Sequence, residues 1–212
     1  MHAISLPESK GIRLFKNNFL EALTHVHPAV PLCLWGPIAL WLLARGVLTH
    51  GYGLVDLGVM LVTAAFAWTL SEYLVHRFVF HFKPKTAPGR YLVYLFHGIH
   101  HDDPNDRTRL VMPPAGAILI IGLIYVLFSL VLPRPWIEPF FGFFIISYLC
   151  YDYTHYAIHF WPMRGRIGAY IKHNHLLHHF QEHNARFGVS TPFWDVVFRT
   201  RGRLPTTTLV KQ

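Results

Sequence analysis

Four long apolar stretches alternate with polar segments along the chain. They cover residues 29–48, 54–75, 115–132 and 136–156, and Pro31 and Pro37 interrupt the first of them. Each stretch is close to the about 20 residues that an α-helix needs to cross the core of a bilayer. The pattern predicts an all-α integral membrane protein with about four transmembrane helices.

The connections within each pair of stretches are short. Residues 49–53 join the first pair, Pro133 to Pro135 join the second, and both segments predict tight hairpin turns. Both termini and the central segment then lie on one side of the membrane. The turns and their edges hold only Arg45 and Arg134, so 17 of the 19 Lys and Arg residues lie on that side. Because positively charged loops favour the cytoplasm, we expect this side to be cytoplasmic.

The charge and the N-terminal segment add little chemistry of their own. The net charge of +8 follows from the same orientation bias and from contact with anionic lipid headgroups, although it also suits an acidic electron carrier. No basic stripe alternates with aromatic residues, which argues against a nucleic-acid partner. Residues 1–28 form an N-terminal segment, amphipathic over 12–23, that we expect to lie on the membrane. Residues 1–18 are polar and basic, so no secretory signal peptide is expected, and 1–212 form one domain.

A few residues inside the predicted spans have ordinary structural explanations. Cys33 and Cys150 lie within spans, where thiols pack well, and no disulfide is expected. Six aromatic residues are predicted to be interfacial anchors or packing residues: Trp68, Tyr73, Trp136, Tyr148, Trp161 and Trp194.

Ten of the sixteen histidines form four tight clusters. They are His76 and His81; His97, His100 and His101; His155 and His159; and His175, His178 and His179. Imidazole is the commonest ligand for transition metals, and one ion takes about four to six donors, so ten imidazoles predict two ions side by side. The other histidines are isolated, with His173 nearest to a cluster, and are expected to be ordinary polar residues: His2, His25, His27, His50, His173 and His183.

Spacing within the clusters indicates how the rings divide. His155 and His159, four residues apart, project from one helix face and suit one ion or two adjacent ions. His76 and His81, five apart, would point well apart around an ideal helix, so they serve different ions or flank a helix end. The doublets in "HGIHH" and "HLLHH" can direct neighbouring rings towards different ions. All ten lie at the cytoplasmic end of a span or just after it.

The residues around these clusters resemble a known family. The runs are "SEYLVHRFVFH", "FHGIHHDDPNDRTRLVMPP", "YDYTHYAIH" and "KHNHLLHHFQEHNARFGVSTPFWDVVF". They are similar to the fatty acid hydroxylase and sterol desaturase superfamily over residues 67–200. The segments "RLVMPP" and "FGVSTPFWDVVF" resemble its sphingolipid fatty acid 2-hydroxylase branch in particular.

This resemblance implies a membrane di-iron oxygenase with four spans and a cytosolic histidine-rich helical cap. Such enzymes use O₂ and two electrons to place a hydroxyl beside an acyl carbonyl, commonly in a ceramide-like lipid. The ten clustered histidines match the metal ligands of the family, and zinc can replace iron in a purified sample. The "HVHPAV" run lacks the Gly pair of a cytochrome b-type haem motif, so we expect the electrons to come from a separate cytochrome or ferredoxin.

Two carboxylates are candidates for supporting the ligands. Asp152 and Glu72 lie three and four residues before His155 and His76, and each is predicted to accept a hydrogen bond from a ligand ring.

Two alternative functions stay open: a hydroxylase or desaturase of a sterol, carotenoid or other lipid, and a non-enzymatic metal-binding membrane protein. A metal conduit would place its ligands at mid-membrane depth, whereas these lie on one side. The expected location is a bacterial inner membrane, or the endoplasmic reticulum in a eukaryote.

Overall fold

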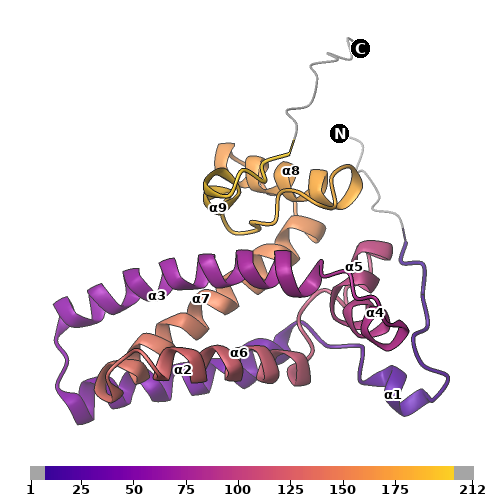
Figure 1. The fold of residues 1–212 in the computed structure, drawn as a ribbon. Coiled ribbons are helices and arrows are strands. Elements are labelled where there is room, and N and C mark those ends of the chain that lie inside the picture. The colour runs from indigo at the N-terminus through magenta and orange to yellow at the C-terminus, as the bar shows by residue number, and fades with distance from the viewer. Residues whose placement is uncertain (1–7, 203–212) are drawn as a thin grey trace.

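The computed structural model describes residues 8–202, which form helices and connecting loops without any strand (Figure 1). Four of the helices are long: α2 (Ala29–His50), α3 (Leu54–Val75), α6 (Pro114–Ser129) and α7 (Arg134–Phe160). They agree with the four predicted apolar stretches to within a few residues. The prediction of an all-helical fold is confirmed.

Both predicted hairpin turns are present. Gly51 follows α2 with φ 68°, a left-handed conformation that favours glycine, and its N–H donates to the carbonyl of Val47 at 3.1 Å. Pro133 directly precedes α7. However, α2 is continuous through Pro31 and Pro37, so the predicted interruption is wrong. Pro31 lies in the first turn, where the missing N–H has no partner within the helix, and a single internal proline such as Pro37 is tolerated in an apolar, packed helix.

The outer surfaces of the long helices are apolar. The ranges Ala29–His50 and Leu54–Phe80 are long and apolar enough to cross a membrane, with mean hydropathy 1.6 and 1.7. Only 22% and 17% of their apolar windows are buried, unlike the core helix of a soluble protein. By the same test α6 is apolar but shorter, and α7, whose buried residues include Asp152, His155 and His159, is not among the helices that pass. The span count of about four stays a prediction.

Helix α7 is the centre of the bundle and packs against α2 and α3. Glycines allow this close approach: a Cβ added to Gly46 would lie 2.7 Å from that of Pro139, and one added to Gly142 would lie 3.0 Å from the carbonyl oxygen of Ala39.

The aromatic residues and cysteines divide between the interior and the surface. Trp68, Tyr73, Tyr148 and Trp194 are buried and act as packing residues, whereas Trp136 and Trp161 are exposed. Both cysteines are free, as expected, but they are exposed on the apolar surface rather than buried.

Short helices form a cap at the end of the bundle opposite the hairpin turns, with α8 and α9 above the ends of α3 and α7 (Figure 1). They are α1 (Asn18–Ala22), the π-helices η1 (His76–Phe80) and η2 (Tyr94–Gly98), α4 (Ala87–Val93), α5 (Ile99–Asp102), α8 (Arg166–Phe180) and α9 (Phe193–Val197). The predicted amphipathic segment over 12–23 is helical only within α1. Its remainder is irregular, and its backbone bonds largely to side chains: the N–H groups of Leu14 and Phe15 donate to Glu21, and the carbonyls of Ile12 and Leu14 accept from Arg109 and Tyr91.

Candidate metal centre

All ten predicted ligands meet in the cap, in two groups. The outer group is His76, His81, His97, His101 and His178, and the inner group is His100, His155, His159, His175 and His179. Within each group the candidate ligand nitrogens lie within 4.8 Å of one another. The inner group is wholly buried, whereas two rings of the outer group are half-buried.

A π-helical turn brings His76 and His81 into the same group. The N–H of His81 donates to the carbonyl of His76 at 3.1 Å, which spans five residues rather than four. The wider turn rotates the two rings onto one face, and their centroids lie 4.9 Å apart. Of the two interpretations of this spacing, different ions or a flanked helix end, the second fits: His76 directly follows α3 and His81 directly follows η1, while both rings belong to one group.

The two doublets divide between the groups. In "HGIHH", His100 joins the inner group while His101 joins the outer one, and in "HLLHH" His178 and His179 separate in the same way. The rings of His101 and His179 stack with centroids 4.2 Å apart, so the groups adjoin.

The spacing of the ring nitrogens fits metal binding. Two donors about 2.1 Å from one ion, at right angles to each other, lie about 3.0 Å apart. Five pairs of Nε2 atoms lie 3.0 or 3.1 Å apart: His76 and His97, His97 and His101, His81 and His178, His100 and His155, and His155 and His175. In addition, the Nε2 atoms of His159 and His179 are buried without a hydrogen-bond partner in the described part of the chain. Buried nitrogens that lack partners are what a metal ion would satisfy.

The environment keeps these imidazoles neutral, as metal ligation requires. Burial, followed by the neighbouring His178, lowers the pKa of His81 to about 3 and that of His101 to about 2. Burial likewise lowers the pKa of His178 to about 4. At neutral pH each of these rings therefore has a nitrogen lone pair available for a metal.

The loop over residues 185–190 orients two rings of the outer group, one from η1 and one from α8. The Nδ1–H of His76 donates to the carbonyl of Phe187 at 2.6 Å, and that of His178 donates to the carbonyl of Ala185 at 2.6 Å. A carbonyl only accepts, so the proton is on Nδ1 in both rings. Their Nε2 atoms then present lone pairs to the group.

Two buried carboxylates hold this loop. Glu72 accepts from the N–H of Val189 at 2.6 Å and from the N–H and hydroxyl of Ser190 at 2.8 and 2.5 Å. Its predicted partner was a ligand ring, whereas its observed partners belong to the loop. Asp195 accepts from the N–H groups of Phe187 and Gly188 at 2.9 and 2.8 Å. No sequence motif indicates Asp195, because only the folded chain brings it beneath the loop.

Asp152 also has partners other than a ligand ring. It is buried, and it accepts from the hydroxyl of Tyr148 at 3.5 Å and from the N–H of Met112. These contacts place it in the wall of a cavity, one helical turn before His155.

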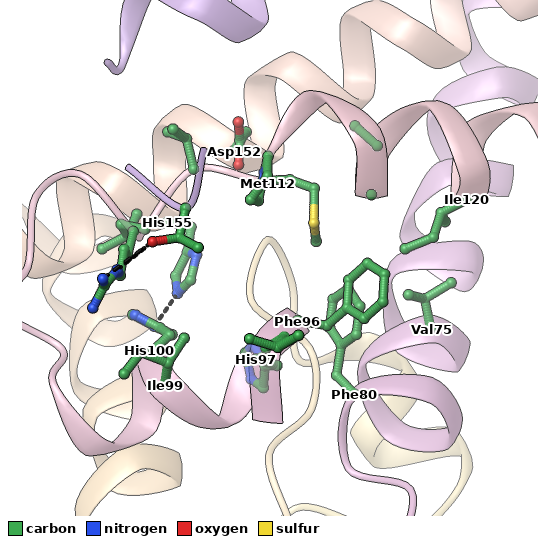
Figure 2. Close-up of a pocket in the computed structure, with 18 of the residues that line it drawn as sticks. Val75, Phe80, Phe96, His97, Ile99, His100, Met112, Ile120, Asp152 and His155 are labelled. Atoms are coloured by element: carbon green, nitrogen blue, oxygen red, sulfur yellow. Dashed lines mark hydrogen bonds between the residues drawn. The ribbon is translucent and has the colours of Figure 1, made fainter. Parts of the chain in front are cut away.

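This cavity, of about 320 Å³, lies directly beside the histidine groups (Figure 2). His97, His100 and His155 line one end of it, and Val75 and Ile120 line the opposite part. Most of the remaining lining is apolar. Its volume is typical of a small-molecule site, and its composition suits a hydrocarbon chain.

The N-terminal segment covers one side of the cavity. Leu14, Phe15, Leu20 and Leu23 line the cavity from this segment. The buried guanidinium of Arg109 fastens the segment, donating to Glu21 at 2.5 Å, to Thr24 at 3.1 Å and to the carbonyl of Ile12. We call residues 12–24 the N-terminal strap. The amphipathic pattern of this segment predicts that it lies on the membrane, and nothing in the pattern indicates these contacts.

Five of the six isolated histidines lie outside the two groups. His25 contacts Thr108, His50 lies 3.5 Å from Glu138, and His27 caps the start of α2. His173 and His183 are exposed, and the ring of His183 lies 5.4 Å from that of His101. His2 lies outside the described residues.

Comparisons with known proteins agree with this site. A sequence profile of the family described as "Fatty acid hydroxylase" matches residues 61–200. The dihydroceramide fatty acyl 2-hydroxylase FAH1 of Arabidopsis thaliana is 36% identical over 199 residues, covering 93% of this chain and 82% of that protein. The human fatty acid 2-hydroxylase is also 36% identical, over 92% of this chain, which spans 58% of the human protein. The solved structure of full-length scs7p, with only its hydroxylase domain visible, matches with a TM-score of 0.80 and 33% identity over 86% of this chain and 69% of that one. The chain therefore belongs to the fatty acid hydroxylase family.

Proposed function

We propose that this protein is an O₂-dependent di-iron hydroxylase that oxidises the 2-position of a fatty acyl chain in ceramide or another sphingolipid. The observation that carries the proposal is the apolar cavity that ends on His97, His100 and His155. It places a site for a hydrocarbon chain next to a cluster of candidate metal ligands. The names of the relatives, a dihydroceramide fatty acyl 2-hydroxylase and a fatty acid 2-hydroxylase, support the choice of lipid and carbon.

We propose iron in both groups, each held by its five histidines. Hydroxylation of an unactivated C–H bond is beyond any protein acid or base, and bound iron supplies the redox chemistry with O₂ that zinc lacks. One oxygen atom enters the C–H bond, and the other leaves as water after taking up two electrons and two protons. A separate cytochrome or ferredoxin is the proposed electron donor.

The residues of the chain then have the task of positioning. The apolar walls around Val75 and Ile120 would hold the acyl chain, and the depth of its insertion would decide which carbon lies beside the histidines. The strap, with Phe15 against Tyr91, would keep water away from this face. Asp152 would support the cavity wall next to His155, and Glu72 would support His76 through the loop it anchors.

We propose that the chain is a multi-pass membrane protein and that its metal site lies on the cytoplasmic face of the membrane. Arginines and lysines are nearly absent from the two hairpin turns and abundant at the other end of the bundle, where the cap lies. In a bacterium this membrane is the inner membrane, and in a eukaryote it is the endoplasmic reticulum.

Lipid mass spectrometry of expressing cells tests the function. Cells with the wild-type protein and a competent electron donor should gain one oxygen at the 2-position of an amide-linked acyl chain. Cells with His178→Ala should not, whereas His173→Ala, which changes an exposed histidine of the same helix, should behave as the wild type. Oxygen elsewhere, or loss of hydrogen, would instead identify a hydroxylase or desaturase of another lipid. No change in any lipid would favour a non-enzymatic metal-binding protein.

A further inference from the structure

The two histidine groups differ in their access to water. All five rings of the inner group are buried, whereas His81 and His101 of the outer group are half-buried. The cavity that reaches the inner group is lined mostly by apolar side chains. A hydrated divalent ion does not cross such a lining, because it would lose its water without gaining ligands. An ion from the cytosol therefore meets the outer group first.

His183 lies at the solvent-facing edge of the outer group. It is exposed, three residues after the end of α8, and its ring lies 5.4 Å from that of His101 at an interplanar angle of 70°. The ring of His101 in turn lies 4.9 Å from those of His81 and His178. His183 makes no hydrogen bond to any other residue between 8 and 202. Its ring is thus available to water on one side and adjacent on the other to His101, which neighbours two further outer ligands.

We propose that His183 is a metal-loading ligand, which takes a divalent transition-metal ion from water and passes it to His101 and His81. This inference rests on the proposed metal centre. An exposed imidazole can replace one water molecule of a hydrated ion, and each later histidine can replace another. The ion then keeps most of its ligands at every step, so the barrier is lower than for complete dehydration at a buried site.

The role is transient rather than permanent. His183 lies outside the set of outer nitrogens that are all within 4.8 Å of one another. That set already offers five donors, and one ion takes about four to six. Removing His183 should therefore change how fast ions arrive, and not how many the protein holds.

Stopped-flow absorbance of Co²⁺ binding to the metal-free full chain, in detergent, separates these effects. His183→Ala should slow loading by about tenfold, the change in rate expected when one modest contact is lost from the transition state. The final spectrum and the ratio of two Co²⁺ per chain should be those of the wild type. His183→Asp, which restores a ligand at the same place, should recover the rate. His173→Ala, an exposed histidine on α8 away from the edge, is the control and should load normally.

An unchanged rate in His183→Ala would overturn the proposal, and so would a loss of bound Co²⁺ at equilibrium, which would make His183 a permanent ligand. Failure of the wild-type chain to bind two ions would instead refute the metal centre itself, which distinguishes the two ideas.

Discussion

Glu72 and Ser190 are 118 residues apart in sequence, yet the carboxylate of Glu72 accepts both the N–H and the hydroxyl of Ser190, at 2.8 and 2.5 Å. These bonds hold the loop whose Phe187 carbonyl accepts the Nδ1–H of His76. Glu72 also precedes His76 by one helical turn on α3. One helix end thus presents a ligand and anchors the loop that orients the same ligand.

Glu72→Gln should weaken metal binding. The substitution removes the negative charge that accepts from the N–H groups of Val189 and Ser190, and its NH₂ group cannot accept from the hydroxyl of Ser190, so the bonds that fix the loop and the ring of His76 weaken. Loss of such supporting contacts typically reduces metal affinity by about 10- to 100-fold. Competition with a chelator measures the affinity. Ser190→Ala removes one bond of three and should have a smaller effect, and equal affinities for Glu72→Gln and the wild type would refute this role.

Gly188→Ala should destabilise the cap. An added Cβ would lie 2.1 Å from the carbonyl oxygen of Thr191 and 2.9 Å from a carboxylate oxygen of Asp195, so the backbone must shift. Overpacking of this kind costs about 1–3 kcal/mol of unfolding free energy. Thermal unfolding measures it. Gly58→Ala, where nothing lies within 4 Å of the new Cβ, is the matched control, and equal melting temperatures for the two variants would contradict the expectation.

Ile120→Trp should exclude long acyl chains. Ile120 lines the cavity away from His100 and His155, so a larger side chain shortens the apolar part while leaving the ligands in place (Figure 2). Turnover of long-chain substrates should fall by about tenfold or more, because the reacting carbon can no longer reach its position. Metal content should stay at the wild-type value. Leu119→Trp changes the neighbouring, outward-facing residue and is expected to retain activity; a parallel loss there would point to a general defect of α6.

Acid should destabilise the metal-free protein. The pKa values of His81, His101 and His178 are lowered in the folded state to about 3, 2 and 4, from an ordinary value of 6.5. Below pH 6.5 the unfolded chain therefore binds more protons, so the free energy of unfolding falls as the pH drops and levels off only below the folded values. Melting temperatures of the metal-free protein between pH 7.5 and 5 measure the slope. A flat profile over this range would show that these rings are not buried in their neutral form.

Arg109→Ala should release the N-terminal strap. The guanidinium is buried and is shared among Glu21, Thr24 and the backbone of Ile12, so its loss leaves several polar groups without a partner. Limited proteolysis should cut within residues 12–24 faster than in the wild type. Arg90→Ala, at an exposed arginine of α4, provides the comparison. Equal cleavage of both variants would mean that other contacts, such as Tyr91 with Leu14, hold the strap.

Local sequence determined the helices and the identity of the candidate ligands. Apolar runs specify the helices of an apolar bundle directly, so α3 begins and ends where its hydrophobic pattern does. Three of the four histidine clusters are likewise local features, because spacings of one to four residues on a helix already bring rings near one another.

Only the tertiary structure decided how those ligands are divided and supported. The π-turn at His76–Phe80 places His76 and His81 together, against the expectation from an ideal helix. The supports of the site, Glu72 with Ser190 and Arg109 with the strap, join segments about 85 to 120 residues apart. Hydrophobic periodicity is set by neighbours along the chain, whereas these hydrogen bonds exist only after distant segments have packed together, so no local pattern encodes them.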